Sequence, residues 1–336
     1  MTGGRILRRS LALAFATVVV APIAPAGADP AGPTDYRSVI DAIAPAVDGV
    51  TVDVVGGDSF LRVRADPGHE VVVIGYWDEP YARITTGGSV EINQSSPSVL
   101  QNTSRYGVAT DEAIDATEPP RWEATGDKGE LVWHDHRSHW MAPAKATAED
   151  GTGLVQRWEL PLVVDGTDVV VHGSLYVYAG PTSLWWVVLL PALAAAVLLR
   201  RHRAVVVAAL GTIITVGGLL DQLSLPSEAR PSWAVIVLAA LATVAALASA
   251  LRRSAWWATP VLAGAALSLT IVGYLQRKAI ERAHVPGPTP DWLVRAAAVS
   301  ALGVGAVVLV SAVLATAGIR LDLLFRAGDE PIASEP

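Results

Sequence analysis

The chain has 336 residues, of which 51% are hydrophobic, and its mean hydropathy of +0.40 is too high for an ordinary soluble domain. It has no cysteine, which excludes disulfides, lipoprotein anchoring, thiolate metal sites and a cysteine nucleophile. The net charge of −7 conceals an asymmetry, because residues 29–182 carry 24 acidic and 10 basic residues. Such an acidic region argues against nucleic acid as a partner, since phosphate binding needs a basic surface.

Residues 1–28 are predicted to be a secretory signal peptide. A basic start that contains Arg8 and Arg9 precedes an apolar run at 11–20, and the small residues at 26–28 fit a cleavage site. The apolar run is shorter than the ~20 residues that a spanning helix needs, which favours cleavage over an uncleaved anchor.

Residues 29–182 are predicted to form an exported all-β domain, an immunoglobulin-like β-sandwich. Short alternating or apolar runs are separated by turn signals, and helical periodicity is almost absent, a pattern typical of a sandwich. These runs lie at 50–55, 60–64, 71–76, 81–84, 89–92, 131–133, 155–164 and 168–178. Asp165-Gly166, between the last two runs, is a strong hairpin signal. Residues 93–120 are polar and turn-rich, so we expect a long excursion there.

A domain of five transmembrane helices is predicted for residues 183–319, followed by a cytoplasmic tail at 320–336. Most of the five apolar segments approach the ~20 residues that cross a bilayer. They lie at 183–199, 204–220, 233–251, 255–274 and 293–318. Ionisable residues occur only at segment boundaries, which argues against a proton-coupled transporter and favours a scaffold or anchor.

The loops predict the orientation in the plasma membrane. Short basic loops at 200–203 and 252–253 belong in the cytoplasm by the positive-inside rule. The acidic domain is then extracytoplasmic and the C-terminus cytoplasmic, with the lipid bilayer as a partner. The loop at 276–291 violates the rule, because it should lie outside and yet carries three basic residues.

A histidine segment, residues 133–141, holds most of the chemical information. Three of the seven histidines fall within it, bracketed by two tryptophans and followed by Met141. Imidazole suits copper and zinc alike, while a thioether ligand from Met141 favours copper. The segment therefore predicts a transition-metal site, with copper as the first candidate and zinc as the alternative.

The spacing of the histidines sets a condition on that site. In an extended strand His134 and His136 point to the same face, so both imidazoles could reach one ion. His139 lies on the opposite face unless a turn or bulge near Ser138 brings it round. Asp135 is a candidate to orient an imidazole as a hydrogen-bonding partner outside the ligand set.

Two other interpretations remain open. The segment could be a buried hydrogen-bond network, with Asp135 paired to Arg137 and the tryptophans in the core. Catalysis has least support, because the chain has no nucleophile elbow, P-loop or dinucleotide fingerprint, and we predict that the protein is not an enzyme. In a second segment, residues 75–83, Glu79 could complete a metal site, but an interpretation with its tyrosines walling the core is favoured.

The segments Gly75-Tyr76-x-x-Glu79-Pro80-Tyr81-x-Arg83 and Trp133-His134-Asp135-His136-Arg137-x-His139-Trp140-Met141 resemble motifs of uncharacterised exported membrane proteins from actinobacteria. This resemblance covers the exported domain and implies architecture rather than an activity. The hairpin at 158–175 is also similar to that of CopC-type periplasmic copper-binding domains, in which a β-sandwich can precede a membrane domain. The expected mature N-terminus, Asp29-Pro30, departs from the N-terminal histidine that such domains use as a copper ligand.

The sequence therefore predicts a membrane-anchored, extracytoplasmic β-sandwich that binds or senses a transition metal, with His134, His136, His139 and Met141 as ligands. The alternative is a non-enzymatic envelope module that binds a protein or cell-wall partner, in which the histidine segment has a structural role.

Overall fold

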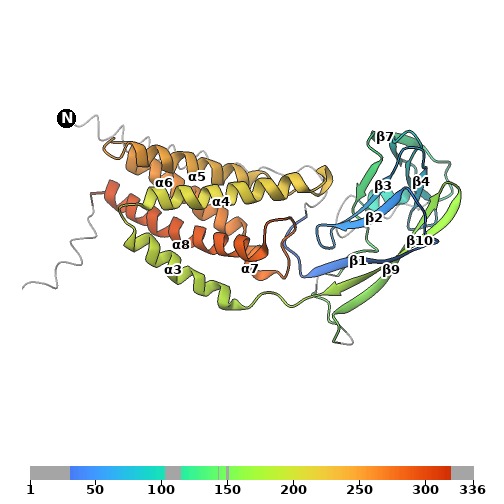
Figure 1. The fold of residues 1–336 in the computed structure, drawn as a ribbon, viewed down its shortest axis with the longest axis horizontal. Helices are drawn as coiled ribbons and strands as arrows, with labels where there is room; N and C mark the ends of the chain where they lie inside the picture. Colours follow the sequence, from blue (N-terminus) through green and yellow to red (C-terminus); the bar gives the residue numbers. More distant parts are fainter. Residues whose placement is uncertain (1–30, 103–114, 143, 149–150, 319–336) are drawn as a thin grey trace, which may run out of the picture.

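The structure, a computed structural model, describes residues 31–102, 115–142, 144–148 and 151–318. An N-terminal antiparallel β-sheet domain is followed by a C-terminal helical region, and the two lie end to end along the long axis of the molecule (Figure 1). The predicted signal peptide and the predicted cytoplasmic tail lie outside the described residues.

The β-sheet domain has two sheets in which the described strand pairs are all antiparallel. The larger sheet has the order β1-β10-β9-β4-β5-β6-β7 and the smaller one β2-β3-β8. The strands are β1 (Tyr36–Ala44), β2 (Val50–Val55), β3 (Phe60–Ala65), β4 (Val71–Ile74), β5 (Pro80–Ile84), β6 (Val90–Asn93), β7 (Trp122–Gly126), β8 (Glu130–Trp133), β9 (Leu154–Val164) and β10 (Thr167–Val177).

Each of the eight apolar runs in the sequence corresponds to a strand, so these predictions are confirmed. The β9–β10 hairpin turns at Asp165 and Gly166, both with positive φ (49° and 79°), as a tight two-residue hairpin loop requires. Two strands were not predicted individually, β1 and β7. Strand β7 has exposed or half-buried side chains throughout, so it lacks the apolar alternation that marks the others.

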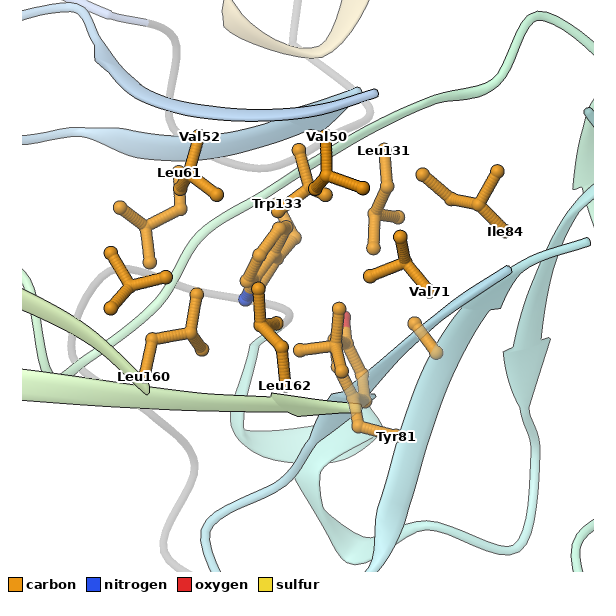
Figure 2. Packing of buried hydrophobic residues seen from close by; sticks show 14 of the residues in the cluster. Val50, Val52, Leu61, Val71, Tyr81, Ile84, Leu131, Trp133, Leu160 and Leu162 are labelled. Carbon is orange, nitrogen blue, oxygen red and sulfur yellow. The ribbon is translucent and has the colours of Figure 1, made fainter. Parts of the chain in front are cut away.

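The two sheets share one hydrophobic core. Trp133 and Leu61 of the smaller sheet lie opposite Leu160, Leu162 and Tyr81 of the larger sheet (Figure 2). The Trp133 and Tyr81 rings are 6.3 Å apart. Because Trp133 is the last residue of β8, its burial in this core anchors the start of the histidine segment.

The helical region contains four helices that are long and apolar enough to cross a membrane, by length and composition, among the described residues. The helical elements are α2 (Pro97–Gln101) in the β-sheet domain, then η1 (Ser183–Val188), α3 (Leu189–Leu198), α4 (Arg203–Ser224), η2 (Ser227–Ala229), α5 (Ala234–Leu251), α6 (Ala258–Leu275), α7 (Arg277–Glu281) and α8 (Asp291–Thr316). The four are α4, α5, α6 and α8, whereas the first predicted span is the shorter apolar helix Ser183–Leu198.

Small residues let the long helices pack closely. A Cβ atom added to Gly211 of α4 would meet Thr243 and the Ala239 carbonyl of α5, and one added to Gly305 of α8 would meet Thr270 of α6. Helices in a membrane associate through such close contacts rather than through the hydrophobic effect. The bundle is therefore a packed unit and a firm support for the β-sheet domain.

The β-sheet domain is docked on the loops at one end of the bundle. Thr34 forms an isolated antiparallel bridge with His284, which lies between α7 and α8. The Ala31 N–H donates to the Ala229 carbonyl of η2 at 3.1 Å. Backbone bonds to two different interhelical loops fix the position of the domain on the bundle.

A buried carboxylate accounts for Arg282, one of the three basic residues in the loop at 276–291. Asp35, only 3% exposed, accepts hydrogen bonds from Arg282 Nη1 at 2.8 Å, Lys145 Nζ at 2.9 Å and the Ala283 N–H at 2.9 Å. Burial opposes ionisation of Asp35, but these three bonds outweigh it and hold the pKa of the carboxyl below its ordinary value. Arg282 therefore serves domain docking, and its loop lies on the same side of the bundle as the β-sheet domain.

Candidate metal centre

The histidine segment begins where β8 ends. Leu131 and Trp133 point into the shared core, so the alternation along the strand directs Val132 and His134 to the other face of the smaller sheet. There the His134 ring meets the edge of Phe60 with ring centres 5.3 Å apart. His134 is thus held between β8 and β3.

The chain turns directly after Asp135, so the condition that the histidine spacing imposes is met. The Asp135 carbonyl accepts hydrogen bonds from the Ser138 N–H at 3.2 Å and the Ser138 hydroxyl at 3.0 Å. The turn lies at His136 and Arg137. Because the chain reverses there, His139 returns to the side of the strand where His134 lies.

The turn brings the three imidazoles, hereafter the histidine cluster (His134, His136 and His139), into contact. The ring centres of His134 and His139 are 4.5 Å apart, those of His136 and His139 are 5.4 Å apart, and those of His134 and His136 are 6.2 Å apart. His134 is 2% exposed and His139 is fully buried, whereas His136 is half-buried. The cluster is therefore a largely buried group that reaches the surface at His136.

His139 is oriented by the backbone. Its Nδ1 lies 3.0 Å from the Asp135 carbonyl oxygen. Since a carbonyl oxygen only accepts hydrogen bonds, this contact assigns a proton to Nδ1 and places the lone pair of the neutral ring on Nε2. A histidine held by a carbonyl in this way is in the tautomer that binds a metal through Nε2.

The Asp135 side chain serves a different purpose from the one considered in the sequence. Its carboxylate is fully buried and accepts hydrogen bonds from Arg137 Nε at 2.9 Å, Arg137 Nη2 at 2.7 Å, the Arg137 N–H at 2.9 Å and Trp133 Nε1 at 2.9 Å. The Arg137 guanidinium also donates to the Ile74 carbonyl. The interpretation in which Asp135 pairs with Arg137 is thus confirmed, and it is the Asp135 carbonyl that orients an imidazole.

The electrostatics of this pair keep both groups charged. Burial opposes ionisation of Asp135, but the adjacent Arg137 guanidinium and the hydrogen bonds to the carboxylate outweigh it and lower the pKa of Asp135. Burial likewise opposes the charged form of Arg137, yet Asp135 raises the pKa of its guanidinium. The Asp135–Arg137 pair therefore stays ionised and stabilises the turn in the histidine segment.

Tyr76 is part of the site, although the sequence placed it in the core. Its hydroxyl accepts from the His136 N–H at 2.9 Å and donates to Asn102 Oδ1 at 2.5 Å. The Tyr76 ring stacks on His136, with ring centres 5.7 Å apart. The Arg137 guanidinium lies over the same Tyr76 ring, 4.9 Å from its centre, in a cation–π contact. Burial raises the pKa of Tyr76 well above its ordinary value, so its hydroxyl keeps its proton. Only its membership of the 75–83 motif hinted at this role.

Glu79 and Tyr81 belong to the framework instead, as the favoured interpretation predicted for the second segment. The Glu79 carboxylate is 3% exposed and accepts from the Ser96 and Ser98 hydroxyls, both at 2.6 Å, and from the Trp77 N–H at 3.0 Å. Tyr81 lies in the core, and burial raises its pKa to about 12. The Glu79 carboxylate is therefore committed to the loop that carries Tyr76.

The fit of a metal ion depends on the ring positions. Within the residues that the structure describes, no group of three or more His, Asp or Glu side chains could hold a metal ion in its present arrangement. Three imidazoles that bind one tetrahedral ion through nitrogens at 2.0–2.1 Å have ring centres about 5 Å apart. The observed separations of 4.5–6.2 Å span that value. These separations concern ring centres, so metal binding would also require the ring nitrogens to be turned towards a common point. Met141 is half-buried, and the ring contacts that define the cluster are those among the three histidines.

Comparisons with known proteins do not assign the chain to a family. No family model and no curated protein matches it. A solved structure named "pT26-6p" aligns at 12% identity and a TM-score of 0.14, over 84% of this chain and 48% of that one. This chain thus spans about half the length of that structure, and so low a score carries no argument. Both resemblances drawn from the motifs remain predictions.

Proposed function

We propose that this membrane protein binds a transition metal at the histidine cluster of its β-sheet domain, with copper as the first candidate and zinc as the alternative. The proposed ligands are His134, His136 and His139, which the turn brings together, and Met141 is proposed as a fourth from its place in the sequence and its thioether. The observation that carries the proposal is the convergence of three imidazoles from one short segment, with ring centres 4.5–6.2 Å apart.

Three features of the surroundings support a metal site. The Asp135 carbonyl sets the tautomer of His139, and the Tyr76 ring and hydroxyl hold His136 in place. Burial of two rings excludes water and strengthens coordination. His136 is half-buried and gives an ion a route to the cluster from solvent.

The position of the cluster supports a sensing role. The His134 ring packs on Phe60, and Phe60 and Val132 form a small hydrophobic cluster with Leu225 and Ala229 of the loop between α4 and α5. A metal that rotates the His134 ring would act on Phe60 and through it on the membrane helices. Hydrogen exchange measured on the full chain should show altered protection of that loop when metal is added.

The finer architecture belongs to the same proposal. Ser183–Leu198 is taken as a fifth crossing, because six residues of 3₁₀-helix and ten of α-helix extend about 27 Å, close to the ~30 Å of the hydrocarbon layer. The immunoglobulin-type description of the sandwich is supported by antiparallel sheets around one core. We propose that the β-sheet domain lies outside the cell, because the positive-inside rule puts the arginine loops in the cytoplasm and these loops lie at the opposite end of the helices (Figure 1).

The test is a titration of the purified full chain with Cu²⁺ or Zn²⁺, in which calorimetry measures the binding. We expect one sub-micromolar site that is lost in a His134→Ala/His136→Ala variant. The matched control is His69→Ala/His172→Ala, because these histidines lie in the same domain and pair with Asp165 and Glu159 at the surface. Met141→Leu should weaken copper binding and leave zinc binding nearly unchanged.

Two outcomes would refute the proposal. Wild-type protein that binds neither metal would remove the metal function, and undiminished binding by the cluster variant would move the site elsewhere. Replacing the buried His134 can itself unfold the domain. A His136→Ala variant is therefore measured alongside, because the His136 side chain is only half-buried, and its thermal transition is recorded. A variant that stays folded and binds with the wild-type affinity contradicts the ligand assignment.

A structural envelope module is the second candidate, and one observation favours it. The bonds of Asp135, Arg137 and Trp133 suffice to order the turn without any ion. In that case substitution of the cluster histidines lowers the stability of the protein and has no effect on metal binding. The docked β-sheet domain then presents its surface to an envelope protein or a cell-wall partner. Absence of metal binding together with destabilised cluster variants would support this alternative.

A further inference from the structure

A second polar site lies at the end of the helix bundle opposite the β-sheet domain. A cavity of about 250 Å³ opens there among the loop between α3 and α4, the end of α5, the start of α6 and the end of α8. Four arginines line it, namely Arg200, Arg201, Arg203 and Arg253. We propose that this cavity, hereafter the arginine pocket, binds the phosphate headgroup of an anionic glycerophospholipid.

The charge of the arginine pocket calls for an anion. In the described part of the chain, none of the four arginines takes part in an ion pair with a carboxylate. Arg203 Nε donates to the Ala196 carbonyl at 2.8 Å and Arg253 Nε to the Ala250 carbonyl at 3.2 Å, so backbone contacts orient both guanidinium groups. Four like charges around one cavity repel one another, and a bound phosphate relieves that repulsion.

Two helix starts add to the same field. Helix α4 begins at Arg203 and α6 at Ala258, and residues of both first turns line the pocket. Neither helix has a side-chain cap at its N-terminus in the described structure. At α4 the first-turn N–H groups and the helix dipole favour an anion. At α6 the Ala258 and Val261 N–H groups already donate to carbonyls and Pro260 has no N–H, so α6 contributes mainly its dipole. The hydroxyls of Ser249 and Ser311 donate to carbonyls of their own helices, so the arginines and the start of α4 provide the main donors.

The surroundings favour a lipid over a free phosphate ion. Leu262 and Val308 form an apolar part of the pocket lining. Nearby, Leu198 and Leu251 are 79% and 81% exposed, as expected for side chains that face acyl chains. A ligand with a phosphate head and hydrocarbon tails matches both parts, and basic pockets between membrane helices bind such lipids.

The chain offers a matched pair of variants to test this. Arg252 and Arg253 are adjacent in one loop, but only Arg253 lines the pocket. The full chain is purified in a nonionic detergent, and retention of phosphatidylglycerol is titrated by native mass spectrometry. We expect Arg253→Gln to weaken retention about fivefold and Arg200→Gln/Arg253→Gln about 25-fold, while Arg252→Gln changes it less than about twofold.

Controls separate a lipid site from other anion binding. Phosphatidylcholine at the same concentrations should be retained weakly by all variants, and millimolar inorganic phosphate should not displace phosphatidylglycerol. An equal loss in Arg252→Gln would show that surface charge alone attracts the lipid and would overturn the pocket. Displacement by inorganic phosphate would overturn the lipid assignment. None of these measurements depends on metal binding.

Discussion

Replacing Arg137 by alanine should be one of the most damaging changes in the β-sheet domain. It removes the hydrogen bonds that Nε and Nη2 donate to the fully buried Asp135 carboxylate, together with the opposite charge itself. Removing one partner of a buried ion pair costs about 3–5 kcal/mol, because the remaining charge is left uncompensated. For a domain of this size the melting temperature should fall by about 6–20 °C.

The assay is thermal unfolding of the full chain, followed by tryptophan fluorescence, at several pH values. In the wild type the pKa of Asp135 is lowered, so its contribution to stability is present above the ordinary pKa and is lost as the pH falls through the folded value. In the variant, burial without the guanidinium raises the pKa of Asp135, and protonation removes the uncompensated charge. The difference in melting temperature between the two proteins should therefore shrink from about pH 7 towards about pH 4.

A surface ion pair on the same domain is the control. Arg64 Nε lies 2.7 Å from Glu130 Oε2, but both side chains are about a third or more exposed. Arg64→Ala should cost about 0–1 kcal/mol, as exposed pairs do. If Arg137→Ala proved as mild as Arg64→Ala, or if its effect did not depend on pH, the reasoning from the buried pair would be wrong.

Two further predictions concern Tyr76 at the histidine cluster and the docking of the domain. Tyr76→Phe removes the hydroxyl that accepts a hydrogen bond from the His136 N–H. We expect a loss of about 1–3 kcal/mol in the free energy of unfolding and weaker metal binding, measured by calorimetry. An unchanged metal affinity would show that this hydroxyl does not position the cluster. Asp35→Asn removes the charge that Arg282 and Lys145 contact, and hydrogen exchange at residues 282–284 should accelerate. Because the pKa of Asp35 is lowered, the protection factors of these amides, taken relative to the intrinsic exchange rate at each pH, should stay high in the wild type above about pH 4 and fall only at lower pH. Equal protection factors in both proteins at neutral pH would contradict a docking role.

The elements were predictable where a local pattern carries the information. The β9–β10 hairpin follows from Asp165-Gly166 between two apolar runs, and the long helices follow from uninterrupted apolar segments. Strand β7 was missed because its side chains are mostly exposed and need no apolar alternation. The first predicted span is shorter than the others, because its six residues of 3₁₀-helix and ten of α-helix end at Leu198, just before the basic residues at 200–203.

The sequence by itself determined the division into a β-sheet domain and apolar helices, and it singled out the histidine segment, because periodicity and composition are properties of neighbouring residues. Only the tertiary structure decided that His139 meets His134, since the reversal depends on bonds to the Asp135 carbonyl and on an Asp135–Arg137 pair held in a buried site. The same holds for Tyr76, whose hydroxyl reaches His136 from 60 residues away. Contacts between distant segments depend on how the sheets pack, and no local pattern records that.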